Sequence, residues 1–295
     1  MKKNIKEEGS AVTVGTFDGV HLGHEKVLST LKDYARSHSL RPLVITFDRH
    51  PLEVVAPERV PRMLQSRRDR DGRLLASGVD VEEVAFTPEL CSLTAKEWMK
   101  ILRDRYGAKA IITGYDNTFG SDGRRLAAED YRRLGAELGL EVIEAPELPG
   151  VCSSCIRRAV AEGEVMKASA MLGRDYTVRG RVVKGRQLGR QIGFPTANLE
   201  IDKRICLPAS GVYAAQLNGL PAVANIGDNP TVEEGNPITV EAHIIGFDGD
   251  IYGQEAALSF VERLRGEIKF DSLEELKKQI GLDAEKAEKL LFNRY

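Results

Sequence analysis

Hydrophobic positions in the first half of the chain form short continuous runs that alternate with longer amphipathic stretches. Between Ala11 and Ala145 the apolar runs include AVTVGTF, PLVITF and AKAIITG, separated by helical patterns such as HEKVLSTLKDYARSH and TAKEWMKILRDRYG. Continuous apolar runs separated by helices are typical of parallel strands that are covered on both faces. The pattern predicts a doubly wound α/β domain, in which ligands bind beyond the carboxyl ends of the strands.

The pattern changes after a helical connector, RRAVAEGEVMKASAMLG. Beyond Asp175, short β-type runs such as YTVRGRVV, GVYAAQL and ITVEAHIIGF are separated by Gly, Pro and Asn turns. Neighbouring strands without intervening helices predict an antiparallel sheet or a small β-barrel. Ser272 and Glu275 have the spacing of a capping box and predict an amphipathic C-terminal helix. We therefore expect two domains, residues 1–172 with the connector and residues 173–295.

Composition and charge narrow the class of protein. The 295 residues are enough for two cores, and 42% hydrophobic with 29% charged residues is typical of an ordinary globular protein. A net charge of -2 supplies no cationic field for nucleic acid or an anionic membrane, and no apolar run approaches the length of a membrane span. The polar start of the chain is unlike a signal peptide, so we expect a cytoplasmic location.

The four cysteines are too few and too scattered for a disulfide framework. Cys152 and Cys155 form a C-x-x-C, a spacing that suits zinc binding or redox chemistry. No second cysteine pair or nearby histidine completes a metal site. We interpret both as packing residues, with the zinc and redox alternatives left open.

The segment VTVGTFDGVHLGHEKVL predicts a strand, a tight glycine-rich loop and a helix. His21 and His24 lie three residues apart at the expected helix start, where free N–H groups and the helix dipole favour a phosphate. Two imidazoles at this point can donate hydrogen bonds to phosphate oxygens. The simpler alternative is a turn with two surface histidines. The combination of three glycines, an aspartate and two histidines in one short segment favours a functional role.

This HxGH segment resembles the signature of the nucleotidyltransferase superfamily, and GTFDGVHLGH resembles its bacterial FAD synthetase branch. ITFDRHP, ITGYDNTFG and VCSSCIR follow in the family's order. The resemblance implies catalytic roles for His21, His24 and Arg157 in adenylyl transfer. It implies ATP-binding roles for Gly15, Phe17, Gly23, Ser153 and Ser154, and flavin-binding roles for His50, Asp116 and Phe119.

Three positions depart from the family pattern. Arg49 stands where the family has proline, Asn117 where it has an aromatic residue, and Cys152 where it has serine. Loss of an aromatic ring from a flavin-binding loop removes stacking worth about 1 kcal/mol. The departures leave the phosphate-binding residues intact and weaken the expected recognition of flavin.

The segment GRVVKGRQLGRQIGFPTANL contains glycines that leave backbone N–H groups open to phosphates, among them Gly185. Pro195 fixes a turn that presents Thr196 and Asn198, whose oxygens suit Mg²⁺ beside ATP. A plain structural turn is the alternative. The segment closely resembles the riboflavin kinase signature, which implies that Gly185, Thr196 and Asn198 bind ATP and that Thr196 and Asn198 hold the metal.

The same resemblance extends through VEAHIIGF and LRGEIKF. It places Glu241 on the family's catalytic carboxylate, which accepts the proton of the attacking ribityl hydroxyl. It implies that Arg265, Glu267 and Phe270 contact flavin, while Asn225, Asn229 and Thr231 are expected near the nucleotide. His243 is expected to orient its neighbours rather than act as a base.

Together these resemblances imply an enzyme that phosphorylates riboflavin to FMN and adenylylates FMN to FAD, with Mg²⁺ and ATP. The expected partners are the small molecules riboflavin, FMN and ATP, without nucleic acid or membrane. Two alternatives stay open: a riboflavin kinase whose adenylyltransferase domain is weak or inactive, and a flavin sensor without catalysis.

Overall fold

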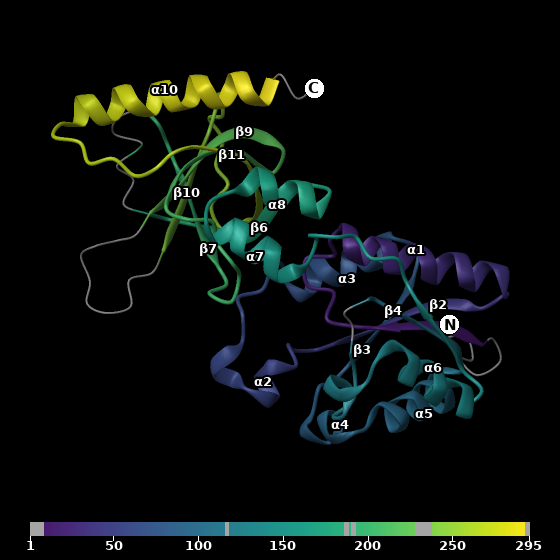
Figure 1. Cartoon of the computed structure of the whole chain (residues 1–295). Helices are drawn as coiled ribbons and strands as arrows, with labels where there is room; N and C mark the ends of the chain where they lie inside the picture. Colours follow the sequence, from purple (N-terminus) through teal and green to yellow (C-terminus); the bar gives the residue numbers. More distant parts are fainter. Residues whose placement is uncertain (1–8, 116–117, 186–188, 190–192, 228–237, 293–295) are drawn as a thin grey trace. The chain divides into compact units, whose positions relative to one another are not determined.

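The computed structural model describes residues 9–115, 118–185, 189, 193–227 and 238–292. The chain divides into two compact units, each described here by itself. The first unit comprises residues 1–61 and 67–151, and the second comprises residues 62–66 and 152–295. Figure 1 shows helices around an open sheet in the first unit and a barrel with helices in the second.

The first unit is built on a parallel sheet in the order β3-β2-β1-β4-β5. The chain runs outward from the centre in both directions, so the expected doubly wound α/β fold is confirmed. The carboxyl ends of β1 and β4, where the order reverses, are the point at which such sheets bind ligands. The strands are β1 (Ser10–Val14), β2 (Arg41–Phe47), β3 (Asp80–Val84), β4 (Ala108–Thr113) and β5 (Glu141–Glu144).

Alternate residues of the central strands face two hydrophobic cores. Ala11 of β1 contributes to the core under α1 (Leu22–Ser37) and α3 (Arg67–Ala76). Val12, its neighbour, contributes to the core under α5 (Ala95–Tyr106) and α6 (Ala128–Glu137). Each face therefore has its own helices, as parallel sheets require. The shorter helices are α2 (Leu52–Val55), η1 (Pro57–Arg59), α4 (Pro88–Ser92) and η2 (Gly123–Arg125).

The second unit contains a closed barrel in the order β10-β7-β6-β11-β8-β9, with antiparallel neighbours. The expected antiparallel barrel is therefore confirmed. One strand, Ala197–Ile201, is not among the predicted runs; it follows directly on the turn at Pro195 that was expected to present Thr196 and Asn198. The strands are β6 (Tyr176–Val183), β7 (Ala197–Ile201), β8 (Gly211–Leu217), β9 (Leu220–Gly227), β10 (Thr239–Ile244) and β11 (Glu255–Arg265).

The connector consists of two helices, α7 (Ser153–Ala161) and α8 (Val165–Leu172). The chain turns between them at Gly163, whose φ of 76° is in the region that favours glycine. Helix α8 contacts β6 and β11, so the connector packs with the barrel. The expected functional boundary between residues 172 and 173 stays a prediction.

A short excursion of the chain, residues 62–66, also belongs to the barrel unit. Met63 forms an isolated parallel bridge with Ile205. Its N–H donates to the Arg204 carbonyl at 2.6 Å, and its carbonyl accepts from the Cys206 N–H at 2.8 Å. Leu64 beside it is buried. The excursion is thus held by backbone hydrogen bonds as well as by burial.

The C-terminal helix α10 (Leu273–Phe292) covers strands β8 and β9 of the barrel (Figure 1). Ala287 and Leu291 pack on Val212, Ala214, Val223 and Val261. The Ser272 hydroxyl accepts from the Glu275 N–H at 3.2 Å, as expected of a cap. The Glu275 carboxylate accepts from the N–H of Asp271 rather than from that of Ser272, so the reciprocal half of the expected capping box is shifted by one residue.

Helix α10 is also fixed by a buried ion pair. Arg265, near the end of β11, donates from Nη2 and Nε to Asp283 at 2.8 and 3.0 Å. The two side chains are only 17% and 6% exposed, and Gln279 donates to the second carboxylate oxygen at 2.9 Å. Asp283 therefore joins two turns of the helix to the barrel.

Replacing Asp283 with Ala is expected to destabilise the protein, because the partly buried Arg265 guanidinium would lose its carboxylate partner. Breaking a fully buried pair costs about 3–5 kcal/mol, and the partial exposure of Arg265 places the expected loss below that range. Urea denaturation of the full chain followed by circular dichroism measures the loss. Glu285→Ala, an exposed position on the same helix, is the matched control and is expected to change stability by less than about 0.5 kcal/mol. Equal effects of the two substitutions would contradict a stabilising role for the pair.

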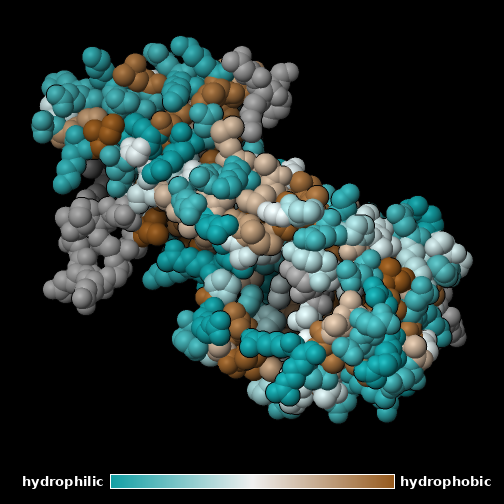
Figure 2. Space-filling model, in the orientation of Figure 1, coloured by the Kyte–Doolittle hydropathy of each residue, from teal (hydrophilic) through white to brown (hydrophobic). Residues whose placement is uncertain are grey.

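Hydrophilic side chains cover most of the face drawn in Figure 2, and the hydrophobic side chains there form small separate areas. Within the described ranges, no helix has the length and apolar character needed to cross a membrane.

Candidate active sites

His21 and His24 cap the first helix of the sheet domain reciprocally. His21 is the N-cap of α1, and its Nδ1 accepts from the His24 N–H at 3.2 Å. The Nδ1 atom of His24 accepts from the His21 N–H at 3.4 Å. The two rings stack with centroids 3.7 Å apart. The three-residue spacing of the histidines therefore follows from the geometry of a helix start.

This arrangement fixes the tautomer of both rings. In both imidazoles Nδ1 acts as an acceptor, so the neutral ring carries its proton on Nε2. The two Nε2–H groups lie at a helix N-terminus, which favours anions, and His21 is 5% exposed. The cap itself uses only the two Nδ1 atoms.

A side chain at position 23 would fit only tightly between the histidines. A Cβ at this position would stand 3.1 Å from ring atoms of His21 and 3.3 Å from the Val151 carbonyl oxygen. Phe17 packs beside the pair. Its side chain is only 3% exposed, and its ring centroid lies 5.0 Å from that of His24. Gly15 leaves room for the Phe17 ring, which would lie 3.2 Å from a Cβ at residue 15.

The loop after β2 is ordered by Asp48. This carboxylate accepts from the Phe86 N–H at 2.8 Å and pairs with Arg49 at 3.2 Å. Burial would raise the pKa of Asp48, but the Phe86 hydrogen bond and the Arg49 charge outweigh it and hold the pKa below its usual range. His50 accepts from the Leu52 N–H through Nδ1 at 3.1 Å, which places the proton of the neutral ring on Nε2.

Phe119 is held in place by Tyr131. The tyrosine hydroxyl donates to the Phe119 carbonyl at 2.8 Å and accepts from its N–H at 3.0 Å, and the rings are 4.8 Å apart. Burial raises the pKa of Tyr131, which keeps the hydroxyl protonated for the first of these bonds. Asp116 and Asn117, which precede Phe119, lie outside the described residues.

The first turn of α7 carries the other expected phosphate ligands. Ser153 and Ser154 open the helix, and Arg157 follows one turn later. Ser154 is exposed, whereas Ser153 and Arg157 are partly buried. These residues belong to the second compact unit and the two histidines to the first. The expectation that Cys152 and Cys155 are only packing residues is wrong, because their sulfur atoms are joined in a disulfide.

In the barrel, Glu241 lies between two asparagines. It pairs with Asn198 of β7 on one side and with Asn225 of β9 on the other. Residues paired in this way point to the same face of an antiparallel sheet. The three side chains are partly exposed, whereas Ala197, Ala224 and Ala242 beside them are buried. The barrel thus presents a row of one carboxylate and two amides.

Thr196 joins this row from the end of the preceding turn. Its hydroxyl donates to the Glu241 carboxylate at 3.4 Å. His243, on the same strand as Glu241, contacts the Pro195 carbonyl oxygen through Nδ1 at 2.8 Å, and its ring meets Phe194 edge-on at 5.2 Å. His243 therefore holds the Phe-Pro turn that presents Thr196.

Gly185 lies directly against the Asn198 amide. A Cβ at residue 185 would overlap the side-chain atoms of Asn198, so only glycine lets the loop pass at this distance. The loop after β6 and the amide of β7 thus fix each other's positions.

Gly185→Ala is expected to push the Asn198 amide out of the row and to lower kcat/KM for the phosphorylation that the kinase resemblance implies. A displacement of about 1 Å in a reacting group can cost about 100-fold. Steady-state kinetics of riboflavin phosphorylation would measure the loss. Gly266→Ala is the matched control, because a Cβ there meets nothing within 4 Å. An unchanged kcat/KM in Gly185→Ala would show that the position of Asn198 is unimportant.

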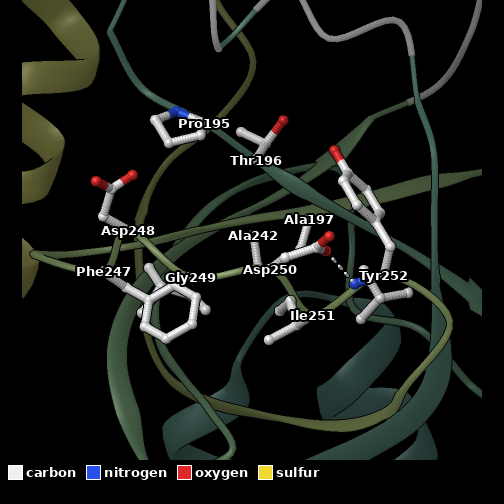
Figure 3. Close-up of a pocket in the computed structure, with 12 residues that line it drawn as sticks. Pro195, Thr196, Ala197, Ala242, Phe247, Asp248, Gly249, Asp250, Ile251 and Tyr252 are labelled. Carbon is white, nitrogen blue, oxygen red and sulfur yellow. Dashed lines mark hydrogen bonds between the residues drawn. The ribbon is translucent and has the colours of Figure 1, made fainter.

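A cavity of about 390 Å³ opens beside Thr196. Figure 3 shows Phe247 and Tyr252 on opposite sides of it, with Pro195 and Thr196 along another edge. The Asp250 carboxylate accepts from the Tyr252 N–H at 2.9 Å and shapes the loop. Apolar walls come from Val182, Ala197, Ala242, Ile244 and Ile251. The kinase resemblance extends over the loop from Phe247 to Tyr252, but no site role was predicted for it, although its two aromatic residues between glycines were a usable signal.

The three residues expected to contact flavin differ in their surroundings. The guanidinium of Arg265 is engaged with Asp283 and lies 5.9 Å from the centroid of the Phe270 ring. The Glu267 carboxylate would lie 3.0 Å from a Cβ at Gly227, two residues from Asn225. Glu267 is thus near the row of polar side chains, while Arg265 anchors the helix. Asn229 and Thr231 lie outside the described residues.

Comparisons with known proteins cover both units. A family described as FAD synthetase matches residues 3–155, and one described as riboflavin kinase matches residues 172–291. A protein of Escherichia coli K12 is 35% identical, over 94% of this chain and 91% of its own. One of Pseudomonas fluorescens is 36% identical, over 97% and 95%. Both relatives are named bifunctional riboflavin kinase/FMN adenylyltransferase.

A solved structure also matches nearly the whole chain. The crystal structure described as a macrolide-efflux protein from Streptococcus pneumoniae is 32% identical, with a TM-score of 0.86 over 97% of both chains. A third relative, from Bacillus subtilis, is 33% identical over 96% of this chain and 93% of its own, and has the same bifunctional name. The chain therefore belongs to the family of bifunctional riboflavin kinase/FMN adenylyltransferases.

Proposed function

We propose that this chain catalyses two successive reactions. Riboflavin and ATP give FMN and ADP at the barrel, and FMN and a second ATP give FAD and pyrophosphate at the sheet domain. The observation that carries the proposal is the row of Thr196, Asn198 and Glu241 beside a cavity large enough for a nucleotide. A carboxylate next to a hydroxyl and an amide is what phosphoryl transfer to an alcohol requires.

In the first reaction Glu241 is the general base. The terminal ribityl hydroxyl attacks the γ-phosphorus of ATP, and its proton passes to the Glu241 carboxylate as ADP leaves. Asn198 and Asn225 flank the carboxylate and limit where the attacking oxygen can lie. Thr196 contacts the same carboxylate and, through the Pro195 turn, is fixed by His243.

The donor atoms of Thr196 and Asn198 fit Mg²⁺. A hydroxyl and an amide oxygen are hard ligands of the kind that Mg²⁺ accepts beside ATP phosphates, and Glu241 provides a negative charge at 3.4 Å from the hydroxyl. When bound, the metal would neutralise charge on the transferring phosphate. Gly185 keeps Asn198 in place for this role.

The cavity beside Thr196 is suited to the adenosine part of ATP. Its apolar walls and the Phe247 and Tyr252 rings provide surface for a flat base, and Thr196 marks its boundary with the polar row. Phosphates of a nucleotide held there would extend toward Thr196 and the loop at Gly185. Flavin would then approach from the side of Glu267 and Phe270.

In the second reaction an FMN phosphate oxygen attacks the α-phosphorus of ATP, and pyrophosphate leaves. The Nε2–H groups of His21 and His24 donate to phosphate oxygens and stabilise the charge that develops. Ser153, Ser154 and Arg157 at the start of α7 hold the triphosphate. His50 and Phe119, with Asp116, bind the flavin.

A kinase with weak adenylyl transfer is the second candidate. Arg49 favours it, because this residue replaces a rigid proline and its guanidinium is engaged with Asp48 on the loop expected to meet flavin. Such a protein would make FMN at full rate and FAD slowly.

One assay tests both candidates. The purified chain is incubated with Mg-ATP and a pyrophosphatase, together with either riboflavin or FMN, and the flavins are separated by chromatography. The proposal requires FMN and then FAD from riboflavin, and FAD from FMN. FMN without FAD favours the kinase alone, and riboflavin binding without turnover favours a sensor.

A further inference from the structure

The disulfide between Cys152 and Cys155 has no part in either proposed reaction. Their Cα atoms are 5.2 Å apart, which is an ordinary separation for a disulfide. The other two cysteines, Cys91 and Cys206, are not part of a disulfide. In the described part of the chain, no group of three His, Cys, Asp or Glu residues could hold a metal ion, so nothing there completes a zinc site around the pair. The pair is therefore a candidate for redox chemistry.

The surroundings of Cys152 would stabilise a thiolate once the bond is opened. Cys152 is the N-cap of α7, and its sulfur accepts from the Cys155 N–H at 3.1 Å. The Ser154 hydroxyl lies 3.1 Å from the same sulfur and can donate to it. A negative charge at a helix N-terminus also gains from the helix dipole. Both cysteines are partly exposed, so a small thiol can reach them.

We propose that Cys152 and Cys155 are a reversible dithiol–disulfide site that exchanges with small dithiols, and that its reduced state weakens ATP binding at the adenylyl site. The second part rests on the proposed adenylyl transfer. Ser153 and Ser154 lie between the two cysteines, and Arg157 follows two residues later, so the redox site and the proposed triphosphate site share one helical turn.

The exchange step is balanced by the external dithiol. One of its thiolates attacks the Cys155 sulfur, the bond to Cys152 breaks, and Cys152 leaves as the thiolate that the N–H and O–H groups hold. The second thiolate of the reagent then attacks the mixed disulfide, releases Cys155 and closes the reagent into a cyclic disulfide. Two electrons pass to the protein. The two reagent protons go to Cys155 and to Cys152 or solvent.

The charge of the reduced site determines whether reduction raises or lowers the affinity for ATP. A Cys152 thiolate and the ATP triphosphate would compete for the same N–H groups and dipole, whereas the disulfide is neutral. The interaction of one charge with a helix terminus corresponds to about a two- to fivefold change in affinity. Because coupling between two sites is reciprocal, ATP must favour the oxidised pair by the same factor.

The test is a redox titration of the full chain in the absence of oxygen. The protein is equilibrated with mixtures of reduced and oxidised dithiothreitol, quenched with an alkylating reagent and digested, and the peptide with Cys152 and Cys155 is quantified by mass. The expected result is a single transition in which both cysteines react together. With a non-hydrolysable ATP analogue and Mg²⁺, the midpoint ratio is expected to shift about two- to fivefold toward the oxidised form.

Arg157→Ala is the control for the coupling, because it should abolish the shift and leave the transition itself. Cys152→Ser retains a capping hydroxyl and removes the redox site, so FAD formation by this variant should not depend on the dithiothreitol ratio. A pair that stays fully oxidised or fully reduced across the whole range would overturn the redox site. A transition whose midpoint ratio is the same with and without the ATP analogue would overturn the coupling. If the pair titrates but no FAD forms in either state, the proposed adenylyl transfer fails and the redox site stands.

Discussion

Glu241→Gln is expected to abolish most riboflavin phosphorylation while FMN is still converted to FAD. Glutamine has nearly the same shape and keeps an oxygen near Thr196, but it cannot accept the proton of the attacking hydroxyl. Removal of a general base costs about 10²–10⁴ in rate. Chromatography of flavins after incubation with riboflavin or with FMN, each with Mg-ATP, measures the two activities separately.

Glu200→Gln is the control for this substitution. Glu200 lies on β7, two residues from Asn198, and is exposed. The same chemical change there should leave both activities unaltered. FMN production by Glu241→Gln near the rate of the unaltered protein would show that another group takes the proton.

His21→Asn is expected to remove adenylyl transfer without unfolding the helix. Asparagine is a favourable N-cap and its side-chain oxygen can accept from the His24 N–H, so the cap is kept. The Nε2–H donor is lost. Loss of one donor to a developing charge costs about 10²–10³ in kcat. The readouts are FAD formation from FMN, FMN formation from riboflavin as the internal reference, and the melting temperature.

The other end of the same helix supplies a matched control. His38 is the exposed C-cap of α1 and stacks on Tyr34, far along the chain from the glycine-rich loop. His38→Asn should therefore leave FAD formation unchanged. The assigned role of the imidazole would be wrong if His21→Asn still formed FAD at the original rate. It would also be wrong if the variant lost both activities and its melting temperature fell.

Most strands could be predicted from the pattern of apolar residues. Strands β6 and β8 have the bounds of the predicted runs. Buried positions alternate with more exposed ones along much of β6, whereas every residue of β8 except Gln216 is buried. Strand β7 was missed although Ala197 and Leu199 alternate with Asn198 and Glu200. Its five residues follow the Pro-Thr turn directly, and the first two of them belong to the P-T-A-N motif. The alternating run is therefore short and overlaps a segment that predicts a turn.

Pairings between distant residues could not be predicted. The bond between Arg265 and Asp283 depends on how α10 lies on the barrel, which no local pattern specifies. The cavity depends on the approach of the Phe247–Tyr252 loop to β7 and β10. The histidine pair is the opposite case, since its two hydrogen bonds span three residues and follow from the helix start alone.

The excursion at residues 62–66 affects how the two halves of this protein could be separated. Because Met63 and Leu64 belong to the barrel unit, the chain crosses between the units after residues 61, 66 and 151 rather than at a single linker. A truncation after Val151 would remove Arg204 and Cys206, the hydrogen-bond partners of the Met63 backbone, and would separate the buried Leu64 from the unit to which it belongs. A barrel starting at Cys152 would lack the same segment. The two catalytic modules are thus joined as interleaved pieces of chain, and neither half is a simple unit for exchange with another protein.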